Sequence, residues 1–289
     1  MKIGKREFDT AHHTYVMGIL NVTPDSFSDG GKYRQLDAAL FHAEQMVSEG
    51  VDIIDVGGES TRPGFQKVSE EEEIARVVPV IEKLKGTVPV PLSVDTYKAA
   101  VAKAAVAAGA DLINDIWGLR QDVKMAEVIA KSGAACCLMH NRKIPEDVPK
   151  TLQNVRSGRK EEWELLGYSN LLPDILSDLE ESLRLAKQAG IPQDNIILDP
   201  GIGFGKTYQM NLEVLKHLEK FQKFGLPVLL GTSRKSVIGL TLDLPVDQRE
   251  EGTLVTTVLA VQSRCAFVRV HDVLKNKRAI QMAEAIRDA

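Results

Sequence analysis

Residues 52–94 read DIIDVGGESTRPGFQKVSEEEEIARVVPVIEKLKGTVPVPLSV and contain one complete structural repeat. Asp52–Val56 has the length and β-branched content of a buried strand. In Glu71–Lys85 the apolar residues recur with a helical period, and Ser69 begins the S-x-x-E pattern of a capping box. A second β-branched run, Val90–Val94, follows. A strand, a helix and a further strand form the repeat of α/β proteins with parallel sheets.

The same alternation runs along the chain. It predicts eight strands, at Val16–Leu20, Asp52–Val56, Val90–Val94, Asp111–Asn114, Ala134–Met139, Ile196–Leu198, Pro227–Leu230 and Ala266–Val270. It predicts eight helices, at Leu36–Glu49, Glu71–Lys85, Tyr97–Ala108, Val123–Lys131, Leu171–Ala189, Asn211–Phe221, Gln248–Ser263 and Asn276–Arg287. Eight strands that are each followed by a helix indicate an α/β fold, a single-domain (β/α)8 TIM barrel.

Composition excludes several classes of protein. Of 289 residues, 44% are hydrophobic and 26% charged, and the net charge of −4 argues against a sequence-independent nucleic-acid binder. No apolar run is long enough to span a membrane, and the N-terminus is too polar for a signal peptide. Cys136, Cys137 and Cys265 suit neither a disulfide framework nor a zinc site, so we expect buried packing cysteines in a cytoplasmic protein.

Two segments fall outside the repeat. Residues 1–15 are too few for a domain, and we expect them to cover the barrel floor. Residues 143–167 form a charged insertion after the fifth strand. A connection of this length is usually a functional lid or a disordered insertion. Its charge favours a solvated, mobile loop over a lid.

Each predicted strand delivers polar side chains at its carboxyl end, where the active site of such a barrel lies. These side chains are Asn21, Glu59 to Arg62, Asp95, Asn114 and Asp115, His140 and Asn141, Asp199, Ser233 to Lys235, Arg269 and His271. Taken singly, Asp95 or Asp199 could cap a helix, and Asn114 or Asp115 could stabilise a turn. Arg269 alternates with apolar residues and needs an anionic partner from the protein or a ligand. Together they predict a functional cleft.

The cleft has two chemical halves. One half is cationic and suits a phosphate group: Arg62, Lys235, Arg269 and His271, with Asn21 beside them. The other half consists of Asp95, Asn114 and Asp199. These acceptors suit a flat heterocycle that presents N–H donors.

In these residues the sequence resembles the dihydropteroate synthase family along nearly its whole length. The matching blocks are Met17–Gly31, Asp52–Gly64, Ser93–Lys98, Gly109–Gly118, Leu138–Arg142, Ile197–Thr207, Leu230–Gly239 and Val268–Val273. The resemblance implies that 6-hydroxymethyl-7,8-dihydropterin pyrophosphate loses pyrophosphate and that p-aminobenzoate attacks the exposed methylene, giving 7,8-dihydropteroate. It also implies Mg²⁺ as cofactor and a homodimer.

The resemblance further implies roles for individual residues. The pterin would be bound by Asp95, Asn114, Ile116, Met139, Asp199, Phe204 and Lys235, although Ile116, Met139 and Phe204 could instead be core packing. The pyrophosphate would be held by Asn21, Arg62, Ser233, Arg269 and His271, with Asn21 also binding the metal. The p-aminobenzoate would contact Thr61, Pro63, Lys235 and Ser236. Asp95, Lys235 and Arg269 would be the catalytic residues, with Asp95 stabilising positive charge in an ionising, SN1-like step.

Two other functions remain open at this point. A methyltetrahydrofolate-type methyltransferase barrel would share the Asp and Asn contacts to a pterin. It has no reason to carry the cations of Ser233–Lys235 and Arg269–His271. A non-catalytic pterin-binding paralogue is a third alternative, but a site without catalysis tends to lose its costly buried charges.

Overall fold

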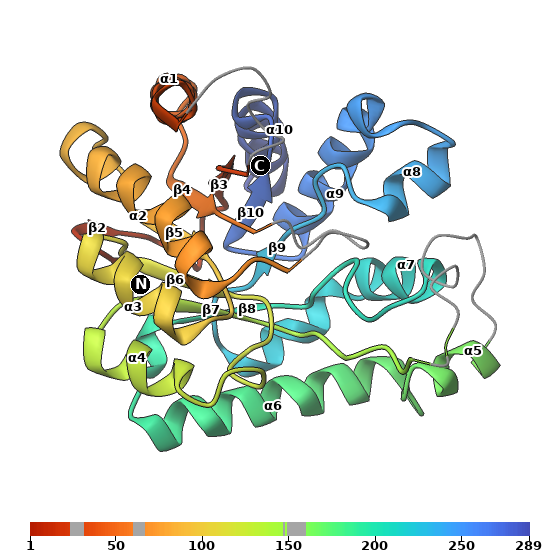
Figure 1. The fold of residues 1–289 in the computed structure, drawn as a ribbon. Coiled ribbons are helices and arrows are strands. Elements are labelled where there is room, and N and C mark those ends of the chain that lie inside the picture. Colours follow the sequence, from red (N-terminus) through yellow and green to blue (C-terminus); the bar gives the residue numbers. More distant parts are fainter. Residues whose placement is uncertain (24–31, 60–66, 147, 149–159) are drawn as a thin grey trace.

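Eight parallel strands form a barrel surrounded by helices (Figure 1). The computed structural model describes residues 1–23, 32–59, 67–146, 148 and 160–289. The strands pair in the order β8-β7-β6-β5-β4-β3-β10-β9. A parallel bridge between Leu198 and Val228 joins the two outer strands and closes the sheet. The structure therefore confirms the predicted (β/α)8 barrel.

The barrel strands are short and the helices cover them. The strands are β3 (Tyr15–Asn21), β4 (Ile53–Gly57), β5 (Leu92–Asp95), β6 (Leu112–Asp115), β7 (Ala135–Met139), β8 (Ile196–Asp199), β9 (Leu229–Leu230) and β10 (Phe267–Val270). The helices are α1 (Lys32–Ser48), α2 (Glu70–Thr87), α3 (Ala99–Ala108), α4 (Met125–Ser132), α5 (Lys160–Leu165), α6 (Leu171–Ala189), α7 (Tyr208–Lys216), α8 (Ser236–Leu242), α9 (Glu250–Gln262) and α10 (Val273–Arg287). Within the described ranges, no helix is both long and apolar enough to cross a membrane.

The observed elements differ from the predicted ones mainly at their ends. Ser69 caps α2 as predicted, because its hydroxyl accepts a hydrogen bond from the backbone N–H of Glu72. The predicted helix Asn211–Phe221 is divided: α7 ends at Lys216, and a 3-10 helix follows over Leu218–Phe224. Sequence periodicity does not distinguish these two kinds of helix over so short a segment.

The strands place alternate side chains inside and outside the barrel. Outward residues such as Val56 and Leu138 belong to the large core cluster under the helices. Inward residues at the amino ends of the strands form a second, smaller apolar cluster that includes Met17, Ile53 and Phe267. Because side chains alternate with a period of two, the next inward positions along the strands lie above this apolar layer and carry the polar side chains.

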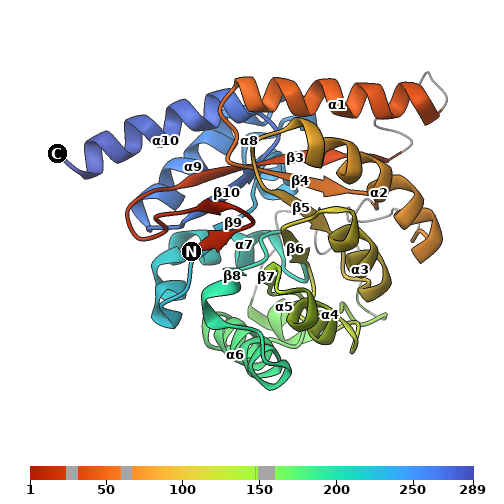
Figure 2. The same ribbon diagram turned by 90° about the vertical axis from the view of Figure 1, so that its left-hand side faces the viewer.

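An N-terminal hairpin and the segment after β7 add to the barrel. Strands β1 (Lys2–Ile3) and β2 (Arg6–Glu7) pair antiparallel. The buried side chains of Ile3 and Phe8 join the inner apolar cluster, and the hairpin lies in front of the barrel in Figure 2. In the described part of residues 143–167, α5 is helical and Leu166 is buried in the core. This part of the insertion is therefore packed, because it carries apolar residues among its charges.

Candidate active site

Arg269 links two carboxylates at the carboxyl ends of the strands. Its Nε donates to Oδ2 of Asp55 over 2.6 Å, and its Nη2 donates to Oδ2 of Asp95 over 2.7 Å. The fully buried Asp55 lies on β4 and Asp95 ends β5. Burial alone would lower the pKa of Arg269, but the two carboxylates raise it above its usual value. The protein thus supplies the anionic partners that an arginine inside a barrel needs.

Asn114 completes this cluster from β6. Its Nδ2 donates to the same Oδ2 of Asp55 over 3.1 Å, and the residue pairs in register with Asp95. Burial raises the pKa of Asp95 to about 7, although Arg269 acts in the opposite direction. In the described part of the chain, Oδ1 of Asp95 has no hydrogen-bond partner. Asp95 therefore keeps one carboxylate oxygen that the protein does not use.

Asp199 and Lys235 form a second group beside the first. Oδ1 of Asp199 accepts a hydrogen bond from the N–H of Gly201 over 2.7 Å. The ammonium of Lys235 donates to the carbonyl of Ile202 and lies 4.6 Å from the ring centroid of Phe204, a cation–π contact. Burial lowers the pKa of Lys235 to about 8 and raises that of Asp199, and each charge opposes the shift of the other.

Two glycines leave space between these groups. A Cβ on Gly57 would lie 3.5 Å from Oδ1 of Asn21 and 3.8 Å from Oδ2 of Asp95. A Cβ on Gly231 would lie 3.7 Å from Oδ2 of Asp199 and 4.0 Å from Nζ of Lys235. These distances place Asn21 and Asp95 beside Gly57, and Asp199, Arg269 and Lys235 beside Gly231. Because Arg269 also bonds to Asp95, the two groups adjoin and present both acceptors and cations.

Two buried apolar residues lie at the strand ends outside the packed core. Ile116 and Met139 are both buried, yet neither belongs to the hydrophobic core clusters. Met139 pairs in register with Asp199. Apolar side chains beside convergent polar groups are typical of ligand slots, and here they favour a ligand wall over core packing.

Ser233, His271 and Ser236 lie at the same end of the barrel. The hydroxyl of Ser233 lies 2.9 Å from Nδ1 of His271, which comes directly after β10 and two positions after Arg269. Ser236 begins α8, directly after Lys235. The predicted residues Thr61, Arg62 and Pro63 lie outside the described residues.

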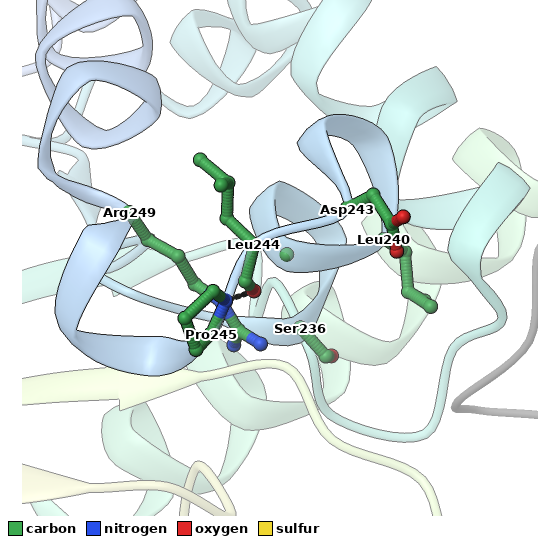
Figure 3. Close-up of a pocket in the computed structure, with 7 residues that line it drawn as sticks. Ser236, Leu240, Asp243, Leu244, Pro245 and Arg249 are labelled. Atoms are coloured by element: carbon green, nitrogen blue, oxygen red, sulfur yellow. Dashed lines mark hydrogen bonds between the residues drawn. The ribbon is translucent and has the colours of Figure 1, made fainter.

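A pocket of about 390 Å³ adjoins the segment that carries Lys235 (Figure 3). It is lined by Ser236, Gly239, Leu240, Asp243, Leu244, Pro245 and Arg249. Arg249 donates to the carbonyls of Leu244 and Arg234, each over 3.0 Å. Gly239 permits this packing, because a Cβ there would lie 2.2 Å from the guanidinium. Arg249 therefore fixes the turn before Lys235, where Arg234 adopts a left-handed φ of 58°.

A buried polar network beside the cluster was not predicted. Nζ of Lys206, which is fully buried, lies 2.8 Å from Nδ1 of His140 and donates to the carbonyl oxygens of Gly201 and Phe204. Nε2 of His140 lies 3.0 Å from a carboxylate oxygen of Asp178 on α6. The network shapes the loop after β8 that places Phe204 against Lys235. Asp55 and Lys206 were both overlooked, although the inward position of Asp55, two residues from Ile53, could have indicated it.

Two simpler expectations, for Asp115 and for the cysteines, hold. Asp115 accepts backbone hydrogen bonds from Trp117 and Leu119, so it stabilises a turn and Asn114 alone faces the cluster. The three cysteines are free and buried, as predicted. Among the described residues, no group of three histidine, cysteine or carboxylate side chains could hold a metal ion.

Comparison with known proteins identifies the family. Residues 17–271 match the family described as pterin binding enzymes. The chain is 55% identical over 287 residues to a dihydropteroate synthase of Clostridium beijerinckii, covering 99% of each chain.

Two solved dihydropteroate synthases share the fold. One, from Clostridium difficile in the presence of pteroic acid, has a TM-score of 0.86 and 46% identity, with 97% of this chain and 99% of that chain covered. Another, a sulfonamide drug complex from Yersinia pestis, has a TM-score of 0.87 and 43% identity, with 100% and 99% covered. The chain belongs to the family of pterin binding enzymes, and within it to the dihydropteroate synthases, which are transferases of folate biosynthesis.

Proposed function

We propose that the barrel mouth joins 6-hydroxymethyl-7,8-dihydropterin pyrophosphate to p-aminobenzoate, forming 7,8-dihydropteroate and pyrophosphate. The observation that carries the proposal is the convergence of three acceptor side chains and two cations, Asp95, Asn114, Asp199, Lys235 and Arg269. Arg269 bonds to Asp95, Asp55 joins Arg269 to Asn114, and Asp199, Arg269 and Lys235 surround the Gly231 position. A pterin presents amino and ring N–H donors together with a carbonyl, and this set complements them. The presence of pteroic acid with the Clostridium difficile relative supports the same assignment.

The pterin would lie between the acids and the apolar walls. Asp199 and Asn114 would accept from its N–H edge, and Lys235 would donate to its carbonyl. Ile116 and Met139 would contact the ring faces. Phe204, which already stacks with the Lys235 ammonium, would hold that ammonium in place.

The reaction breaks the bond between the pterin methylene and the pyrophosphate oxygen, and the electron pair leaves with the pyrophosphate. Positive charge then develops on the methylene and ring, and the ionised Asp95 carboxylate would stabilise it. The nitrogen lone pair of p-aminobenzoate forms the new C–N bond, after which the nitrogen releases a proton. An aromatic amine is neutral near pH 7, so no strong base is needed before the attack.

The leaving pyrophosphate would be held at the cationic rim. Arg269 uses two of its five N–H groups on Asp55 and Asp95 and so keeps others for phosphate oxygens. Ser233 and His271 would assist it, as would Arg62. Mg²⁺ prefers oxygen ligands, and the amide oxygen of Asn21 suits it together with phosphate oxygens and waters, where the ion would neutralise the leaving group.

The p-aminobenzoate would contact Ser236 and Lys235, together with Thr61 and Pro63. Ser236 also lines the pocket of Figure 3, whereas the acidic residues of the cluster, Asp55, Asp95 and Asp199, do not line it. The two substrates would therefore approach Lys235 from different sides.

We also propose that the enzyme is a cytoplasmic homodimer. Helices α9 and α10 pack against each other and expose large apolar side chains, namely Val255, Leu259, Leu274, Met282 and Ile286. Exposed apolar side chains on two adjacent helices are typical of an interface. Sedimentation at micromolar concentration tests the dimer, and a monomer would refute it.

The decisive assay measures dihydropteroate formation with pterin pyrophosphate, p-aminobenzoate and Mg²⁺. Omitting any one of the three should abolish the product. In Asp95→Ala we expect kcat to fall far more than pterin affinity, because the charge matters most in the transition state. A folded sample that makes no dihydropteroate, or that instead transfers a methyl group to a corrinoid, would overturn the proposal.

A further inference from the structure

Asp55 is a fully buried carboxylate, and two residues of the polar cluster depend on it. Its side chain is fully buried, and a single oxygen, Oδ2, accepts from both Asn114 and Arg269. The acid therefore contacts the site through these two neighbours, and its charge also helps to raise the pKa of Asp95.

The bond to Asp55 fixes which way the Asn114 amide faces. If the amide were reversed, Oδ1 would lie about 3.1 Å from a carboxylate oxygen, and two acceptors at hydrogen-bond distance repel each other. The amide nitrogen must therefore face Asp55. Among the described residues, Oδ1 of Asn114 has no hydrogen-bond partner, so the ligand side of this residue is an acceptor.

The same oxygen also fixes the plane of the Arg269 guanidinium. One bond from Nε to Asp55 and one from Nη2 to Asp95 hold two edges of a planar group. Without Asp55, the guanidinium would keep only the Asp95 contact and could rotate about it. The N–H groups that the cleft offers to an anion would then lose their direction.

We propose that Asp55 is a positioning residue that makes Asn114 recognise an N–H donor and holds Arg269 for the departing anion. The inference rests on the proposed function, because it assigns the donor to the N–H edge of the pterin. It also explains why a carboxylate remains at a fully buried position that makes no contact with substrate. Burying a charge is costly, and among the described residues Oδ1 of Asp55 has no hydrogen-bond partner, so the bonds that offset this cost are the two that Oδ2 accepts from Asn114 and Arg269.

The test compares two ligands that differ at this edge. 6-Hydroxymethylpterin carries an amino group where 6-hydroxymethyllumazine carries a carbonyl. Calorimetry gives the Kd of each ligand, and their ratio measures how strongly the site selects a donor. In Asp55→Ala we expect pterin affinity to fall about tenfold and the ratio to fall by a similar factor, because the Asn114 amide can reverse. Asp55→Asn should restore most of both, since its amide oxygen can accept from the same two groups.

Asp52→Ala is the matched control. Asp52 is also buried next to β4, at the opposite end of the strand, and accepts from Arg6 Nη2 over 2.5 Å and Lys277 Nζ over 2.7 Å. Its substitution should lower the Tm but leave both Kd values unchanged. A general loss of packing would instead affect the two variants alike.

The outcomes separate this inference from the proposed function. If the wild type makes no dihydropteroate, the proposed function fails whatever the variants do. If the wild type turns over and Asp55→Ala keeps the wild-type ratio of Kd values, the positioning role is overturned. Should Asp55→Ala not fold, Asp55→Ser provides the same ratio, because its short hydroxyl leaves room for water but cannot reach both partners.

Discussion

Adding one methyl group at Gly231 should stabilise the protein and impair its ligand site. The Cβ of Gly231→Ala would lie 3.7 Å from Oδ2 of Asp199, 3.8 Å from Cβ of Arg269 and 4.0 Å from Nζ of Lys235, all ordinary contacts. The backbone of Gly231 does not have a positive φ. Alanine therefore fits the folded chain, and restricting the unfolded chain should add about 0.4–1 kcal/mol to the free energy of unfolding.

In the liganded protein the same methyl group would occupy space that the pterin needs. Overpacking a filled site costs about 1–3 kcal/mol, which corresponds to a pterin Kd roughly 5- to 150-fold higher. We expect the Tm of Gly231→Ala to rise by about 1–3 °C. Thermal unfolding and calorimetry with 6-hydroxymethylpterin measure the two effects.

The control is Gly86→Ala on α2, where the added Cβ would have no atom within 4 Å apart from its chain neighbours and the backbone of its own helix. A helical glycine replaced by alanine should raise the Tm in the same way, with the pterin Kd unchanged. If Gly231→Ala bound pterin as tightly as the wild type does, the prediction that the pterin lies against Gly231 would be wrong. If its Tm fell by several degrees, the packing around Gly231 would be tighter than described.

Three further predictions concern pH and the loop after β8. Burial raises the pKa of Asp95 to about 7 and lowers that of Lys235 to about 8. Because the reaction needs the charged forms of both groups, kcat/KM should decrease at pH values below about 7 and above about 8. Asp95→Asn should remove the decrease on the acidic side. Burial, with the nearby lysine ammonium, lowers the pKa of His140 to about 3, so between about pH 6.5 and 3 the unfolded chain binds a proton that the folded chain does not. The free energy of unfolding therefore decreases as the pH falls through that window. In His140→Gln, urea unfolding should show a shallower dependence of the free energy of unfolding on pH there, and an unchanged dependence would contradict the assignment. Gly201→Ala should lower the free energy of unfolding, measured by urea unfolding, by at least about 3 kcal/mol. The reason is that φ is 71° and the added Cβ would lie 1.8 Å from the carbonyl oxygen of His140. A near-neutral result would show that this loop can move.

Much of the fold was predictable because parallel strands and amphipathic helices leave strong local patterns. The run Ile196–Leu198 contains only one residue fewer than β8, and Gly190 ends α6 in the left-handed conformation. The hairpin at Lys2–Glu7 was not predicted. Two strands of two residues carry no periodic signal, and they form because Ile3 and Phe8 close the apolar end of the barrel.

The site was predictable only in part. Asp95 ends its strand, and Asn114 and Arg269 lie one residue before the ends of theirs, so the barrel geometry brings them together. Asp55 and Lys206 are different, because their importance depends on partners distant in sequence: Asp55 meets Arg269, 214 positions away, and Lys206 meets His140. A single sequence shows that such residues are polar but not which ones meet. The roles of Asp55 and Lys206 therefore become visible only in the three-dimensional structure.

The closure of the barrel has a consequence for how it responds to substrate. Among the residues that the structure describes, β8 and β9 are joined by a single bridge, Leu198–Val228, and β9 itself has two residues. Asp199 stands on one side of this seam, and Gly231 and Lys235 stand on the other. A rigid planar ligand held by residues on both sides of this seam would connect the two weakly paired strands. Ligand binding should therefore raise the free energy needed to unfold the whole barrel.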